Sequence, residues 1–291
     1  MGYSGRYHAA SLAAVFVALA IGILIGIGLA DDVVSSASEE VENALRDDRD
    51  EAEARVDELE AEVDRQQRFD DQAGPALVAN RLTRERVAVV ALGDLPDEET
   101  ATDAQRAVEA AGGELAAVVV VEMPPDVEGL RQAAGGRFDR RDDPASTEEL
   151  GTAIGRDLVE GGPLVERVRD QLFERFNGSL EDITRVVFVS QPPDELQADL
   201  SGDGRAFEAA FVRAVDDAAF GAAGVERTGA DPTTLPVFDG SGISTVDNID
   251  EVAGQVSLVF ALLGAEGNFG VKEDATSLLP DLIPGEAQQA P

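Results

Sequence analysis

The sequence contains no cysteine, which excludes disulfides, thiolate metal sites and a cysteine nucleophile. Its single histidine, His8, lies in a long apolar segment, so a Ser-His-Asp triad elsewhere in the chain is excluded as well. Positive charge is scarce: 23 Lys and Arg stand against 58 Asp and Glu, for a net charge of −35. Such an acidic surface repels phosphates, so nucleic acid is not an expected partner.

Several catalytic signatures are also missing. No GxGxxG follows the first expected strand, and the chain has no Walker sequence, GxSxG elbow or HExxH pair. Neighbouring carboxylates occur, but among 58 acidic residues such pairs arise by chance. We therefore expect a protein that is not an enzyme.

What the sequence does have is an uncharged apolar segment at residues 7–30, between Arg6 and Asp31. At about 1.5 Å per residue it can cross a hydrocarbon layer about 30 Å thick. A cleaved signal peptide is the alternative, but signal-peptide cores run to about 7 to 15 residues, so we favour an uncleaved anchor in the lipid bilayer. Because Arg6 precedes the segment, the positive-inside rule predicts a single-pass protein with residues 1–6 cytoplasmic and the C-terminal domain extracytoplasmic.

Small residues recur every four positions in this segment, with Ala18, Gly22 and Gly26 at the centre of the stripe. Such a stripe lets a second membrane helix approach closely, and it predicts an oligomerisation face. The alternative interpretation is that alanine and glycine are common in any membrane helix.

Residues 31–71 are rich in charge and read as a long exposed helix. Leu45, Val56, Leu59 and Val63 follow the three-and-four spacing of a heptad seam, with Arg49 in one core position. This pattern predicts a coiled coil and, next to a membrane anchor, a homodimer. A solvated single helix is the alternative.

Residues 72–272 alternate between short apolar runs and amphipathic segments, with a break expected at residues 73–75. We expect strands at 87–92, 115–121, 184–190 and 225–228, and helices at about 97–111, 205–223 and 252–263, with a helical middle region broken by glycines. The order predicts the α/β class: an open, mostly parallel, Rossmann-like sandwich after the transmembrane helix and the coiled-coil helix. Ligands would bind at loops 93–96 and 191–194, beyond strand ends. Residues 273–291 are expected to be a flexible tail.

Two blocks resemble a known family. HAASLAAVFVALAIGILIGIGL at residues 8–29 and GISTVDNIDEVAGQVSLVFALL at residues 242–263 are similar to the two distinctive segments of the actinobacterial copper-transport family typified by mycobacterial MctB. The resemblance implies copper transport or copper homeostasis at the cell envelope, with copper as the implied ligand. The alternative is a dimeric envelope scaffold, or a cell-wall or division-associated interaction protein, that contacts an envelope protein and has no copper chemistry.

The second block also contains the most distinctive polar residues of the soluble part, namely Ser244, Asp247, Asn248 and Asp250. They are candidates for contact with a ligand or partner. The competing interpretation, which we favour, is that they cap the helix beginning near residue 252 and shape its turn.

Overall fold

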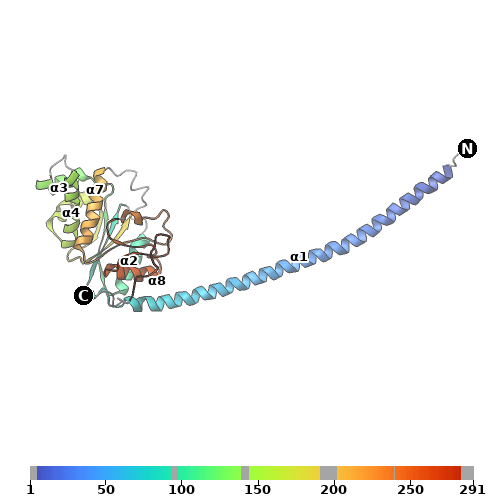
Figure 1. Cartoon of the computed structure of the whole chain (residues 1–291), viewed down its shortest axis with the longest axis horizontal. Coiled ribbons are helices and arrows are strands. Elements are labelled where there is room, and N and C mark those ends of the chain that lie inside the picture. Colours follow the sequence, from blue (N-terminus) through green and yellow to red (C-terminus); the bar gives the residue numbers. More distant parts are fainter. Residues whose placement is uncertain (1–4, 94–97, 139–143, 191–201, 239, 283–291) are drawn as a thin grey trace, which may run out of the picture. The chain divides into compact units, whose positions relative to one another are not determined.

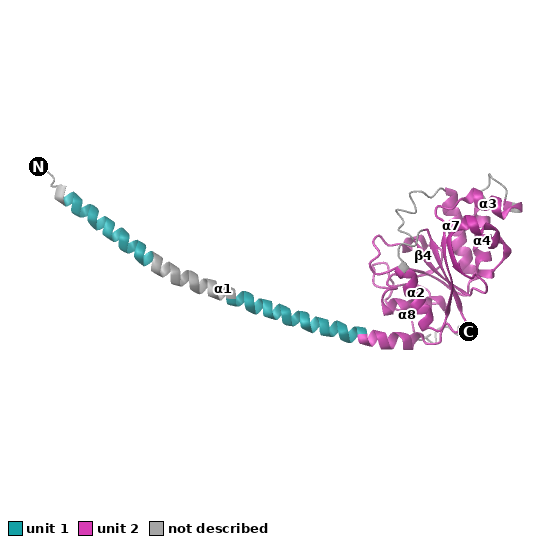
Figure 2. Cartoon of the chain, turned by 180° about the vertical axis from the view of Figure 1, so that it is seen from behind, with its two compact units in different colours: residues 1–67 teal, residues 68–291 magenta. Residues whose placement is uncertain are grey.

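The structure is a computed structural model, and it describes residues 5–93, 98–138, 144–190, 202–238 and 240–282. The chain divides into two compact units, residues 1–67 and residues 68–291, coloured teal and magenta in Figure 2.

The first unit belongs to one helix, α1 (Gly5–Val78), whose last residues belong to the second unit. Its segment Tyr7–Gly26 is long and apolar enough to span a membrane, with a mean hydropathy of 2.5. The stripe glycines at 22 and 26 are open, since an added Cβ at either would meet no atom within 4 Å. The heptad residues are also exposed, at 63% for Leu45, 52% for Val56, 59% for Leu59 and 52% for Val63.

The break expected at residues 73–75 is wrong, because α1 continues through Pro75 to Val78. Proline removes one helical hydrogen bond and crowds the carbonyl four residues earlier, yet here it lies within the last turn of the helix. Packing in the second unit holds that turn. Val78 is 3% exposed, and Gly74 faces Val252 with no room for a Cβ.

The second unit is built on a seven-stranded, mostly parallel sheet in the order β3-β2-β1-β4-β5-β6-β7. Every neighbouring pair is parallel except β2 and β3. The strands are β1 (Arg86–Leu92), β2 (Glu114–Val121), β3 (Phe173–Gly178), β4 (Arg185–Ser190), β5 (Ala222–Val225), β6 (Ser244–Val246) and β7 (Asn268–Phe269). The expectation of an α/β domain with an open, mostly parallel sheet is confirmed.

Helices cover both faces of this sheet (Figure 1). They are α2 (Glu98–Ala110), α3 (Val127–Ala134), α4 (Pro144–Glu160), α5 (Pro163–Leu172), α7 (Gly202–Ala218) and α8 (Val252–Leu262), with short 3-10 helices η1 (Gly136–Phe138) and η2 (Leu235–Phe238). Side chains of β1 alternate between two cores, because successive residues of a strand point to opposite faces. Val90 packs in the core with α4 and α7, while Val89 packs in the core with α2 and α8.

Three strands were not expected from the sequence, namely β3, β6 and β7. Strand β3 is an antiparallel edge with mostly exposed side chains, so it lacks the apolar run of a buried strand, and β6 and β7 are very short. The expected helix at 205–223 ends earlier, at Ala218, and the strand expected at 225–228 lies at 222–225. Its small residues fit a tight space, since a Cβ at Gly224 would lie 2.5 Å from the Phe238 ring.

Candidate functional site

Of the four polar residues singled out in the sequence, Ser244 begins β6, and Asp247, Asn248 and Asp250 lie in the turn between β6 and α8. The expectation that they cap α8 and shape its turn is wrong for the cap, because the N-cap residue is Glu251 and its side chain makes no capping hydrogen bond. Only Asn248 acts within this turn, donating from Nδ2 to Glu251 Oε2 at 3.0 Å. The other three bind segments that are distant in the sequence.

Ser244 and Asp247 hold the chain that follows α8. Ser244 Oγ donates to the carbonyl of Ala265 at 2.8 Å and accepts from the backbone N–H of Gly267 at 3.2 Å. Asp247, which is 3% exposed, accepts from the backbone N–H of Val271 at 2.8 Å and of Lys272 at 2.9 Å. These bonds fix the position of Lys272.

Lys272 forms an ion pair with Glu226, which follows β5, and the Nζ–Oε1 distance is 2.6 Å. The same ammonium donates to the carbonyl of Ala230 at 2.6 Å. The carboxylate also accepts from Thr233 Oγ1 at 2.7 Å, from the backbone N–H of Thr234 at 2.6 Å and from Thr234 Oγ1 at 3.0 Å. With its side chain 2% exposed, Glu226 is therefore a buried charge whose partners satisfy both of its oxygens.

Asp250 holds the start of the same loop. Its Oδ1 accepts from the backbone N–H of Thr228 at 2.7 Å and from Thr228 Oγ1 at 3.1 Å. The loop after β5 is thus fixed at one end by Asp250 and at the other by Glu226. Sequence reasoning named Asp250 but missed Glu226 and Lys272. The sequence did contain one feature that could have drawn attention to Lys272, because it is the only lysine among the 23 basic residues of the chain.

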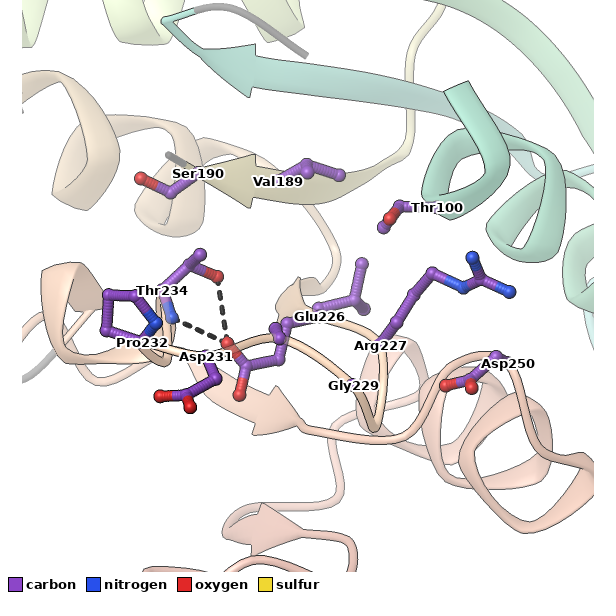
Figure 3. Close-up of a pocket in the computed structure, with 12 residues that line it drawn as sticks. Thr100, Val189, Ser190, Glu226, Arg227, Gly229, Asp231, Pro232, Thr234 and Asp250 are labelled. Carbon is purple, nitrogen blue, oxygen red and sulfur yellow. Dashed lines mark hydrogen bonds between the residues drawn. The ribbon is translucent and has the colours of Figure 1, made fainter. Parts of the chain in front are cut away.

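Next to this loop is a cavity of about 490 Å³ at the carboxyl ends of β4 and β5. Figure 3 shows Val189 and Ser190 of β4, with Thr100 of α2, on one side, and Glu226, Thr234 and Pro232 on the other. Val225, Arg227, Gly229, Ala230, Asp231 and Asp250 complete the lining. Arg227 contacts two acidic residues of α2, Glu99 and Asp103, the latter at 3.2 Å.

The cavity lies close to the region where the sequence predicted a ligand site. That prediction named loops 93–96 and 191–194; apart from Gly93, both fall outside the described residues. Within the described ranges, no group of three or more His, Cys, Asp and Glu side chains is arranged to hold a metal ion. The structure therefore provides a small cavity whose walls carry hydroxyl, carboxylate and apolar groups.

Residues 3–280 match the family model described as "Copper transport outer membrane protein, MctB". Curated relatives include the proteins named "Copper transporter MctB" of Mycobacterium bovis and Mycobacterium tuberculosis. Each is 27% identical to this chain over 316 residues, which cover 94% of this chain and 98% of the relative. Since the family model spans nearly the whole chain, this protein belongs to the MctB family of copper transport outer membrane proteins.

Proposed function

We propose that this protein is a membrane-anchored component of copper transport and copper homeostasis at the cell envelope. The observation that carries the proposal is the family match over residues 3–280, which includes the apolar segment Tyr7–Gly26. Deleting the gene should raise cell copper or copper sensitivity, and the intact gene should restore both. Unchanged copper content and unchanged growth in copper would contradict the proposal.

The proposed topology places the N-terminus in the cytoplasm and the α/β unit outside the membrane. Arg6 before the apolar segment supports this orientation. Because the chain has no native cysteine, single introduced cysteines report their side of the membrane without background. An impermeant thiol reagent should label Glu109→Cys in intact cells whose outer layers are permeabilised, and should leave Ser4→Cys unlabelled. The reverse labelling would contradict the topology.

Copper enters this proposal as cargo of a larger assembly and is not assigned to a site in this chain. Copper(I) prefers thiolate, thioether and imidazole ligands, and the sequence offers no Cys, one His and two Met. The residues present do not fit a copper(I) site of the usual kind. Purified protein loaded with copper(I) should therefore retain less than one equivalent after desalting, and stoichiometric retention would contradict this part of the proposal.

The proposed assembly begins with a homodimer formed along α1. The support is the seam of Leu45, Val56, Leu59 and Val63, each more than half exposed in the single chain, together with the small-residue stripe of Ala18, Gly22 and Gly26. Leu59→Arg should weaken crosslinking between two copies in the membrane. Ala61→Arg introduces the same charge two residues after Leu59, at a position outside the seam, and should leave the crosslinking unchanged.

A dimeric envelope scaffold or division-associated interaction protein without copper chemistry is the second candidate. The specific observation in its favour is that an exposed seam on α1 coexists with the scarcity of copper(I) ligands. Affinity purification from membranes should then recover a reproducible envelope protein, and that recovery should be lost with Leu59→Arg. Normal copper content in the deletion strain would favour this candidate over the first.

A further inference from the structure

We propose that the cavity at the carboxyl ends of β4 and β5 binds a small, uncharged, polyhydroxylated molecule of monosaccharide size. This inference goes beyond the copper role and does not depend on it. The cavity has a volume of about 490 Å³, which is within the range of small-ligand pockets, about 300 to 1,000 Å³.

The place of the cavity in the sheet favours a ligand. The chain runs outward from β1 to β2 and β3, and then returns to the other side of β1 to continue through β4 and β5. In open α/β sheets, ligands bind beyond the carboxyl ends of the strands near the point where the strand order reverses. The order reverses between β1 and β4, and the cavity lies next to that point, because Ser190 ends β4 and Glu226 directly follows β5.

The loop that forms one wall is held before any ligand arrives. Glu226 accepts three hydrogen bonds from Thr233 and Thr234, and Asp250 accepts two from Thr228. Lys272 connects Glu226 to the carbonyl of Ala230. Such a preformed wall lowers the entropy lost on binding, which is how a small site gains affinity for a weakly interacting ligand.

The wall offers hydrogen-bonding groups that the described protein leaves open. Thr100 is 4% exposed and lines the cavity, yet its hydroxyl makes no hydrogen bond to any residue that the structure describes. Asp250 uses Oδ1 for Thr228, and no hydrogen bond to Oδ2 occurs within the described ranges. Each of these two groups can bind a hydroxyl of a polyhydroxylated ligand, because a hydroxyl both donates and accepts, while the C–H groups of the ligand can contact Val189, Val225 and Pro232.

The charges of the lining select against ionic ligands. Glu226, Asp231 and Asp250 repel an anion, and the one guanidinium of the lining, Arg227, already faces Glu99 and Asp103. Glu226 is already paired with Lys272, and within the described ranges the remaining carboxylates are not grouped to hold a metal ion. An uncharged molecule rich in hydroxyl groups therefore matches the cavity best.

The test uses the full chain in lipid nanodiscs, which avoid sugar-based detergents. D-glucose, N-acetyl-D-glucosamine and myo-inositol are titrated, and binding is followed by saturation-transfer NMR and calorimetry. We expect saturable binding of at least one of these neutral probes and weaker binding of glucose 6-phosphate than of glucose. Absence of saturable binding for all three neutral probes, or tighter binding of the phosphorylated sugar, would overturn the proposal.

Two variants locate the site. Gly229→Leu adds bulk at the wall, where an added Cβ meets no atom within 4 Å, and should abolish binding without disturbing the fold. Thr100→Val removes one hydroxyl and should weaken binding about 3- to 10-fold. Thr152→Val makes the same chemical change on α4, outside this cavity, and should bind as the parent does. Binding that survives Gly229→Leu unchanged would also overturn the proposal.

Discussion

The ammonium of Lys272 lies 2.6 Å from Oε1 of Glu226 and thereby joins the loop after β5 to the chain after β7. Every other basic residue of the chain is arginine, and the one lysine forms this contact with a nearly buried carboxylate. An ammonium is a compact point charge with three donors, so it can reach Glu226 and the carbonyl of Ala230 together.

Lys272→Met should lower the free energy of unfolding by about 2 to 3 kcal/mol, because Glu226 keeps a buried charge without its cation. Urea unfolding of the full chain in nanodiscs measures the loss. Glu226→Gln in the Lys272→Met background should recover part of it. If the double variant is as unstable as the two single losses added together, the two side chains do not act as a pair.

Asp247→Ala should destabilise the same region by about 2 kcal/mol, because two backbone N–H groups, those of Val271 and Lys272, lose their acceptor. Hydrogen exchange at these two amides should accelerate. Asp274→Ala, a matched change at an exposed position of the same segment, should leave exchange and stability nearly unchanged. Equal effects of both substitutions would contradict the role given to Asp247.

Stability should also depend on pH through Glu208 of α7. Burial raises the pKa of its carboxyl from 4.5 to about 7, and nearby Arg205 opposes the rise. Between these two values the folded state binds the proton more tightly than the unfolded state, so stability falls as pH increases from about 4.5 to 7.

Glu208→Gln removes this dependence and should raise the free energy of unfolding on the order of 2 to 3 kcal/mol at pH 8, with little gain below pH 4.5. Thermal unfolding at a series of pH values measures the difference. Glu166→Gln, at an exposed position of α5, serves as the control. A gain that is equal at pH 4 and pH 8 would show that the raised pKa is not its cause.

The close approach of α4 and α7 requires glycine at two positions of α4. A Cβ at Gly155 would lie 2.5 Å from the carbonyl oxygen of Phe211, and one at Gly151 would lie 2.6 Å from that of Phe207. Gly155→Ala should therefore cost about 1 to 3 kcal/mol, although alanine favours helices by about 1 kcal/mol. Gly229→Ala, where a Cβ meets open space, should change stability by less than about 0.5 kcal/mol in urea unfolding. A stabilised Gly155→Ala protein would contradict this packing.

Sequence reasoning found the elements whose pattern is local. The run at residues 87–92 is apolar throughout because β1 is buried on both faces, and α8 was located from its apolar run to within one residue. It missed β6 and β7, since strands of three and two residues carry no detectable period. The helix break predicted at Pro75 was wrong, because tertiary packing of Gly74 and Val78 holds the last turn of α1, and such packing cannot be read from local sequence.

The candidate site was predictable in part. Ser244, Asp247 and Asp250 were identified as distinctive, but their partners lie in other segments of the chain, so their roles could not be read from spacing. Glu226 was one acid among 58, and its burial depends on Lys272, which is 46 residues away. Long-range polar pairs of this kind leave no periodic signal in a single sequence.

The central claim, a membrane-anchored role in copper transport, is tested most directly by cell copper in a deletion strain. Copper per cell is measured after growth in added copper, with the strain complemented by the full chain or by the chain lacking residues 1–30. We predict that the full chain restores low copper and that the shortened chain, expressed to the same level, does not. Copper that is unchanged by the deletion, or restored equally by both chains, would contradict the account.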